Sequence, residues 1–186
     1  MKVFLQHSSM YLYDILFREV KQVYIELIFH FLRKEGLRVH THVGSENWNR
    51  AAALYVRMQV FVMERGIPLK EEFDSEDRDE TIYVVVYDGE KPVATGRYKL
   101  VDPQTIRPGR IAVLNEYRKN GLGELVVQEL EKIGLEHGCT HSVIHGEVAA
   151  AEFYEKLGYT RDSDVYEEDG VPCVTLVKLL QGEKKS

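Results

Sequence analysis

The stretch that decides the fold reads RIAVLNEYRKNGLG and occupies residues 110–123. Its first part, residues 110–114, is an apolar, β-branched run that predicts a strand. Apolar residues then recur at helical spacing over residues 121–137, which predicts a helix. The first amide N–H groups of a helix have no intrahelical acceptor, and the helix dipole is positive there. The turn between the two elements is therefore suited to an anion such as a diphosphate.

The turn itself combines two cations with two glycines. The glycines let the backbone approach an anion without a Cβ atom in the way, and the cations add charge. A Rossmann fingerprint would need a third glycine where Val126 stands, and a Walker loop would need Gly-Lys-Ser/Thr, so neither motif fits. The alternative is a glycine-rich turn with incidental charge. The candidate anion-binding residues are Arg118, Lys119, Asn120, Gly121, Leu122 and Gly123.

The rest of the chain alternates strands with helices. Patterns of apolar residues between turn signals predict strands at 37–43, 81–87, 92–100, 142–145 and 171–179, and helices at 46–65 and 149–157. This order, with a mostly antiparallel start, predicts an α+β (mixed α/β) fold.

An amphipathic pattern also runs over about residues 9–34 and stops at Gly36. We therefore expect an N-terminal helical extension at 1–36, a single main domain at 37–180 and a polar tail at 181–186. The apolar stripe of the extension must be covered by its own domain or by a second subunit, so a homodimer is one open alternative. A vector-derived or misassigned start is another.

Composition narrows the class of protein. The chain has 186 residues, enough for one well-packed core, and a net charge of -6 that offers no field to attract nucleic acid. Charged residues interrupt the apolar N-terminus, which argues against a signal peptide or a membrane span. The two cysteines, Cys139 and Cys173, show no CxxC spacing and are interpreted as reduced thiols. We expect a cytoplasmic protein.

No metal site is expected. His40 and His42 share one face of a predicted strand, but no third ligand is evident.

Several motifs together resemble a known superfamily. IAVLNEYRKNGLG followed by EFYEKLGY resembles the acetyl-CoA signature of the GNAT N-acetyltransferases, and VFVMERGIP, VATGRYKL and DGVPCVTLVKLL are similar to its ElaA-like and YjcF-like branch. The likeness covers residues 37–180. It implies the GNAT fold, a central, mostly antiparallel twisted sheet flanked by helices. It also implies transfer of an acetyl group from acetyl-CoA to a primary amine, by direct attack in a ternary complex.

The resemblance also assigns roles to residues. Ile111, Ala112 and Val113 would offer backbone groups to pantetheine, the turn at 118–123 would hold the pyrophosphate, and Phe153 would lie against the cofactor. Tyr154 matches the usual general acid; a packed core aromatic is the less favoured alternative, because Phe153 can fill that place.

No general base stands out from the sequence. Glu72 and Glu147 are the leading candidates, among further carboxylates at Glu64, Glu71 and Asp74. A solvated acidic loop explains the run at 71–80 as well. If that loop lined the cleft, its charge would favour a cationic amine.

Two alternatives remain at this stage. Cys173 could be an acyl-relay nucleophile, but a small buried thiol is the preferred interpretation. The acceptor could be a small molecule or a peptide amine. The rival function is a non-catalytic acyl-CoA-binding sensor or interaction module.

Overall fold

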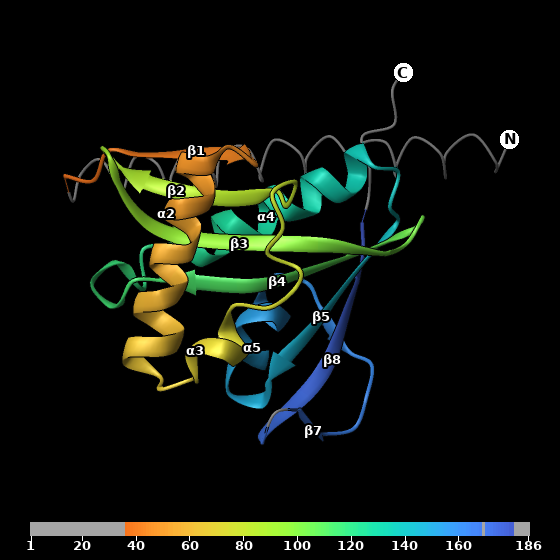
Figure 1. Ribbon diagram of the computed structural model, residues 1–186. Helices are drawn as coiled ribbons and strands as arrows, with labels where there is room; N and C mark the ends of the chain where they lie inside the picture. Colours follow the sequence, from red (N-terminus) through yellow and green to blue (C-terminus); the bar gives the residue numbers. More distant parts are fainter. Residues whose placement is uncertain (1–35, 169, 181–186) are drawn as a thin grey trace, which may run out of the picture. The chain divides into compact units, whose positions relative to one another are not determined.

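The computed structural model describes residues 36–168 and 170–180, which form one sheet of eight strands with helices on both faces (Figure 1). The strand order is β1-β2-β3-β4-β5-β8-β6, and β7 pairs with β8 beside this path. The strands are β1 (Val39–Gly44), β2 (Tyr83–Asp88), β3 (Lys91–Asp102), β4 (Thr105–Val113), β5 (His141–Glu147), β6 (Thr160–Arg161), β7 (Tyr166–Glu168) and β8 (Val171–Leu179).

The sheet is mostly antiparallel. β3 pairs antiparallel with β2 and β4, and β8 pairs antiparallel with β5, β6 and β7. Between these two groups, β4 and β5 run parallel. The predicted mixed α/β fold with a mostly antiparallel sheet is confirmed.

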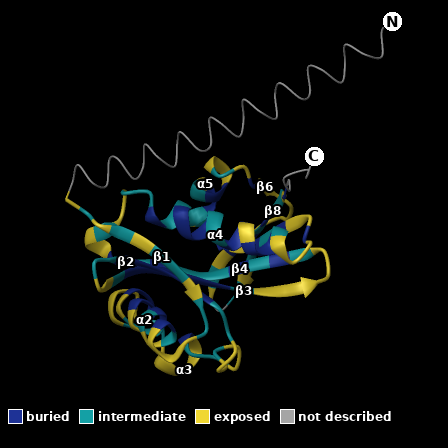
Figure 2. Cartoon of the chain, turned by 90° about the horizontal axis from the view of Figure 1, so that it is seen from above, coloured by how far each residue is buried: buried dark blue, intermediate teal, exposed yellow. Residues whose placement is uncertain are grey.

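Helices cover the two faces differently. Figure 2 shows α4 and α5 on one side of the sheet and α2 and α3 on the other. The helical segments are α2 (Asn47–Arg57), the π-helix η1 (Met58–Glu64) that continues it, α3 (Leu69–Glu72), the 3-10 turn η2 (Asn115–Tyr117), α4 (Leu122–Glu136) and α5 (Val148–Lys156).

The long helix α4 lies unusually close to strand β3 at one point. A Cβ atom built on Gly96 would lie 2.7 Å from Cγ1 of Val126 and 3.0 Å from Cδ1 of Leu130. Both helix residues are fully buried. Only glycine allows this approach, so Gly96 fixes how deeply α4 packs onto the sheet.

The predicted elements are present, with differences that have physical causes. β4 starts at Thr105 rather than at residue 110, because Pro108 and Gly109, which normally argue against a strand, still lie in the ladder with β3. The predicted helix at 46–65 changes to a π-helix from Met58 onward. The extension at 1–36, Gly36 excepted, and the tail at 181–186 lie outside the described residues.

A β-bulge in β4 opens the sheet. Thr95 of β3 faces Ala112 and Arg97 faces Gly109, so two residues of β4, Arg110 and Ile111, stand opposite one. Arg110 has φ of 51°, a left-handed conformation that is uncommon for a residue with a side chain. A bulge bends its strand. On its other edge, β4 pairs in parallel with β5 only as far as Ile106, so the two strands are unpaired from there to the bulge and beyond.

The acidic segment after α3 packs onto a buried arginine. Arg57 of α2 has no exposed surface, and it donates to the Glu72 carboxylate at 2.5 Å and to the two Asp77 oxygens at 2.5 and 2.9 Å. Arg97 of β3 donates to Asp77 at 2.6 Å and to Asp74 at 2.6 Å. The interpretation of this segment as a solvated acidic loop is therefore wrong for its central carboxylates, because they pair with arginines whose spacing in the sequence gives no signal.

We predict that Arg57→Met destabilises the fold by about 3 to 5 kcal/mol, because it removes the fully buried cation that two buried carboxylates share. Chemical unfolding followed by circular dichroism measures the effect. Lys156→Met is the matched control, since it removes an ion pair with Glu152 whose two side chains are 71% and 78% exposed. Equal, small changes in both variants would contradict a structural role for the arginine.

Candidate active site

The turn before α4 presents a run of unpaired backbone amides. The N–H groups of five consecutive residues donate to no acceptor among the described residues. Gly121, the N-cap of α4, has φ of 77°, and Lys119 has φ of 64°. These left-handed conformations turn successive amides toward one region, and α4 adds the positive end of its dipole. The five amides are those of Lys119, Asn120, Gly121, Leu122 and Gly123.

Arg118 is held in place by three partners, since one terminal nitrogen also donates to Oδ1 of Asn115 at 3.3 Å. Its Nε donates to the carbonyl of Val113 at 3.1 Å, and its two terminal nitrogens donate to the Glu64 carboxylate at 2.7 and 2.6 Å. The guanidinium lowers the pKa of Glu64, and the carboxylate raises the pKa of Arg118. The cation of this turn is thus oriented by β4 and neutralised from the end of η1.

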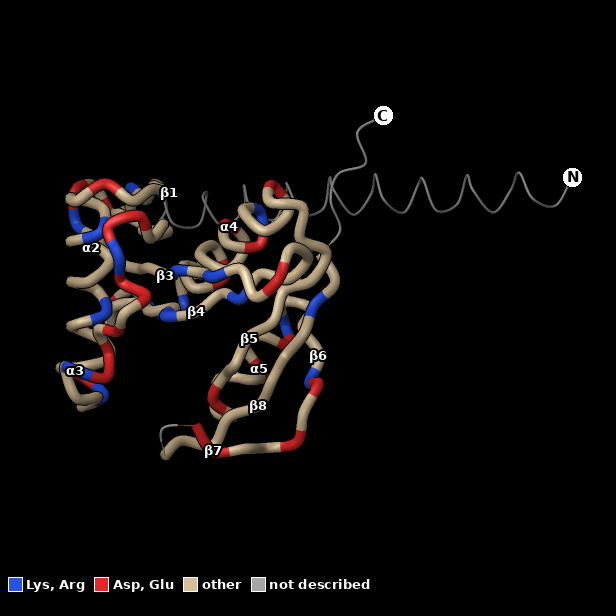
Figure 3. Tube along the Cα trace, turned by 45° about the vertical axis from the view of Figure 1, so that its right-hand side comes forward, with Lys and Arg blue, Asp and Glu red and all other residues tan. Residues whose placement is uncertain are grey.

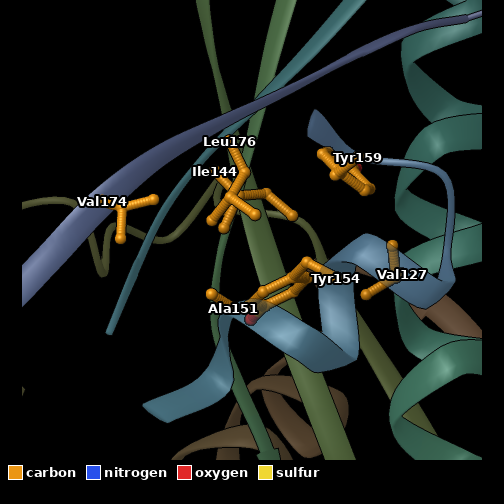
Figure 4. Close-up of a cluster of buried hydrophobic side chains, with 7 residues drawn as sticks. All are labelled: Val127, Ile144, Ala151, Tyr154, Tyr159, Val174 and Leu176. Carbon is orange, nitrogen blue, oxygen red and sulfur yellow. The ribbon is translucent and has the colours of Figure 1, made fainter. Parts of the chain in front are cut away.

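Tyr154 of α5 belongs to a buried apolar cluster, and the residue as a whole is 9% exposed (Figure 4). The other buried members are Val127, Ile144, Ala151, Tyr159, Val174 and Leu176.

The Tyr154 hydroxyl behaves differently from its ring. It makes no hydrogen bond with the described residues. If it were also fully buried, it would be a buried polar atom without a partner, but among the described residues only Nε of Arg110 is in that state. The hydroxyl therefore keeps access to solvent. Burial, together with the charge of Glu147, raises the pKa of Tyr154 to about 12. The ring therefore packs in the core, while the hydroxyl stays protonated and unengaged at neutral pH, and the role of Tyr154 as general acid stays a prediction.

Glu147 lies at the end of β5 where α5 begins, next to Gly146, where an added Cβ would lie 3.3 Å from Cε2 of Tyr154. Its carboxylate accepts a hydrogen bond from Arg65, the residue that follows η1, and both side chains are 35% exposed. The partnership joins residues 82 positions apart, so no local sequence pattern could have revealed Arg65. The structure thus brings together one acid candidate, Tyr154, and one base candidate.

Glu72, the other base candidate, has a different environment. Its Oε1 accepts from Arg57 and its Oε2 lies 3.5 Å from Nε of Arg110, while only 1% of the residue is exposed. Burial raises the pKa of the Glu72 carboxyl, although both arginines oppose that rise. The carboxylate is engaged by cations on both oxygens, so it is less accessible to an incoming amine than Glu147.

The remaining predicted cofactor residues gather at the turn. Ala112 is buried, Ile111 packs against the Tyr154 cluster, and the Val113 carbonyl holds Arg118. A Cβ atom on Gly123 would lie 3.3 Å from Cζ of Phe153, whose ring contacts Tyr154 edge-on at 5.0 Å. The predicted cofactor set therefore surrounds one place, where β4, α4 and α5 meet.

Several other predictions concern groups away from this place. Cys139 and Cys173 are both buried and form no disulfide, as expected of small core thiols. Within residues 36–168 and 170–180, no three His, Cys, Asp or Glu side chains are arranged to hold a metal ion. None of the helices in the described ranges has the length and apolar character that crossing a bilayer would require.

Comparison with known proteins agrees with this geometry. Residues 48–159 match the model of the acetyltransferase (GNAT) family. The chain is 41% identical to the uncharacterised protein YyaT of Bacillus subtilis over 128 residues, which are 68% of this chain and 86% of YyaT. It is 37% identical over 127 residues to the uncharacterised N-acetyltransferase YjcF of the same organism, covering 68% of this chain and 89% of YjcF. The chain belongs to the GNAT family of acetyltransferases.

Solved structures extend the comparison. A Lactobacillus plantarum protein, provisionally named an N-acetyltransferase, superimposes with a TM-score of 0.74 at 37% identity, covering 77% of this chain and 99% of that one. Escherichia coli ElaA shares the fold, with a TM-score of 0.66 at 21% identity, over 75% of this chain and 99% of ElaA. The resemblance to the GNAT superfamily and its YjcF branch is confirmed, and the chain is of the acyltransferase class.

We predict that Glu64→Gln raises the affinity of the turn for inorganic pyrophosphate by roughly two- to fivefold, because it frees Arg118 from an exposed ion pair. Calorimetric titration measures the change. Glu136→Gln, at the opposite end of α4, alters the net charge equally and should leave the affinity as it was. A gain of the same size in both variants would mean that only overall charge matters.

Proposed function

We propose that this protein transfers an acetyl group from acetyl-CoA to a primary amine by direct attack within a ternary complex. The observation that carries the proposal is the run of five unpaired amides at 119–123, at the start of α4 in a GNAT chain. Unpaired, converging amides at a helix N-terminus bind phosphate groups without further reorganisation. The pyrophosphate of CoA is an anion of that kind.

The bound cofactor would supply an activated thioester, and the chain would supply position and charge. The amides of the turn, with Arg118 and Lys119, would hold the pyrophosphate through charge-assisted hydrogen bonds. Beyond Ile106, the edge of β4 that faces β5 is unpaired and would offer backbone groups of residues 111–113 to pantetheine. Phe153 would shield the cofactor beside Gly123.

Acid and base chemistry would come from two neighbouring groups. With its pKa raised to about 12, the Tyr154 phenol is protonated at neutral pH and can donate to the departing sulfur. Glu147, half-exposed at the end of β5, would accept the amine proton, directly or through a water molecule. Holding the two reactants together would contribute most of the rate.

Binding and turnover test the proposal together. Calorimetric titration with acetyl-CoA is run beside a free-thiol release assay over a panel of primary amines. Binding with amine-dependent thiol release is the expected result. Binding without any turnover would favour an acyl-CoA sensor, and no binding of acetyl-CoA would overturn the proposal.

For the acid, we predict that Tyr154→Phe lowers kcat by about 10²- to 10⁴-fold, the usual worth of a general acid. The affinity for acetyl-CoA should stay the same, because the ring and its packing remain. Tyr55→Phe, at a tyrosine 44% exposed on α2, is the control and should leave kcat unchanged. A Tyr154→Phe enzyme with full activity would remove the phenol from the mechanism.

For the turn, we predict that Gly121→Val weakens acetyl-CoA binding by at least about tenfold, because a β-branched residue resists φ of 77° and distorts the amides. Gly89→Val is a matched control. Gly89 has φ of 60° at the β2–β3 hairpin, with no atom within 4 Å of an added Cβ. The control should lose comparable stability and keep its acetyl-CoA affinity; parallel losses of affinity would argue against a specific role for the turn.

A further inference from the structure

The negative charge of the acidic segment at 71–80 is largely neutralised by neighbouring arginines. Three of its carboxylates pair with three arginines from α2, β3 and β4. The formal charges of this group therefore cancel. The basis for expecting a cationic acceptor, a negatively charged loop along the cleft, is absent at its centre. The carboxylates are Glu72, Asp74 and Asp77, and the arginines are Arg57, Arg97 and Arg110.

The sheet carries two other cations on the face that α4 does not cover. Lys99 of β3 and Arg107 of β4 are directly opposite in the antiparallel ladder, so their side chains share one face. Ile106, the residue before Arg107, packs against Gly134 of α4, which places Arg107 on the other side of the sheet. Figure 3 shows the Lys and Arg segments of β3 and β4 lying side by side.

These two cations lack partners. Neither Lys99 nor Arg107 makes a side-chain hydrogen bond, ion pair or ring contact with the part of the chain that the structure describes. In contrast, each of the three arginines that contact the acidic segment is paired with a carboxylate. Unmatched charges that share one face of a sheet repel each other, so an anion placed between them would be bound favourably.

The same face leads to the proposed reaction centre. On β5, Ile144 packs in the Tyr154 cluster, so His145 and Glu147 project to the opposite face, where Arg65 reaches Glu147. The positive charges of Arg107 and Lys99 act on His145 and, after burial, help to lower its pKa.

One carboxylate on this face contacts His145. Glu168 of β7 has its Oε2 at 3.5 Å from Nδ1 of His145, so it lies against the histidine ring and partly opposes the lowering of its pKa. Two residues along a strand span about 7 Å. The register that pairs Ile106 with Ser142 places Arg107 level with Val143, four residues before Glu147, so an acceptor that joins the two must span about 13 Å less the reach of the Arg107 side chain.

We propose that Lys99 and Arg107 form the specificity subsite for an anionic group on the acceptor, so that the preferred amine also carries a carboxylate or a phosphate. This inference rests on the proposed acetyl transfer and names its substrate class. The guanidinium of Arg107 can hold either anion with two parallel hydrogen bonds, and Lys99 adds a point charge from the neighbouring strand. Glu147 would then meet the amine end.

The test compares three amines of similar length that differ in the charge of their far end, namely gamma-aminobutyrate, butylamine and putrescine. Binding of each is measured calorimetrically on the full chain, both alone and saturated with CoA, and thiol release is measured with acetyl-CoA. Phosphoethanolamine against ethanolamine distinguishes a phosphate from a carboxylate. The variant is Lys99→Gln with Arg107→Gln, and Lys132→Gln with Lys156→Gln is the control of equal charge.

We expect an anionic amine, gamma-aminobutyrate or phosphoethanolamine, to bind at least about tenfold more tightly than its uncharged counterpart, and putrescine to bind most weakly. The double variant should remove this preference while its acetyl-CoA affinity stays the same, and the control should keep it. A flat or reversed ranking, or a preference that survives in the double variant, overturns the anionic subsite. If the ranking holds but acetyl-CoA does not bind, the proposed function fails and the anion site stands.

Discussion

The architecture of the candidate site depends on how briefly β4 and β5 pair. Their hydrogen-bonded register covers Thr105 with His141 and Ile106 with Ser142. Beyond it the bulge at Arg110 bends β4, and one edge of the strand has no partner inside an otherwise continuous sheet. Unpaired backbone groups inside a fold are costly unless a solvent or ligand satisfies them. The sheet thus has an unpaired strand edge at its middle as well as at its rim.

A second constraint is an ion-pair network on the other face of the sheet, which holds α2 and the bulge in β4 in fixed positions. Arg57, Arg97 and Arg110 come from a helix and two strands, and the acidic segment ties all three together. Because Arg110 sits in the bulge itself, the network that secures α2 also fixes the strained residue that opens the sheet. Buried ion pairs contribute little net stability, but they define geometry when every charge is matched.

The sequence predicted the elements and the strand–turn–helix geometry at 118–123 well, because both depend on local signals; that the turn binds a cofactor stays a prediction. Apolar periodicity and the glycines at 121 and 123 are readable within a few residues. What it could not predict are partnerships between distant residues, such as Glu64 with Arg118 and Arg65 with Glu147. The start of β4 was missed for a different reason, since proline and glycine are tolerated where tertiary pairing outweighs local preference.

The two adjacent residues at the end of η1 have opposite charges and contact different parts of the candidate site. Glu64 holds the cation of the cofactor turn, and Arg65 holds the carboxylate beside Tyr154. An anion that displaced Glu64 from Arg118 would disturb the neighbouring contact as well, since both belong to one short segment. Any such coupling must be reciprocal: an acceptor that engages Glu147 would change the cofactor's affinity by the same factor as the cofactor changes the acceptor's. The cooperativity between the two substrates would then depend on a single pair of neighbouring side chains.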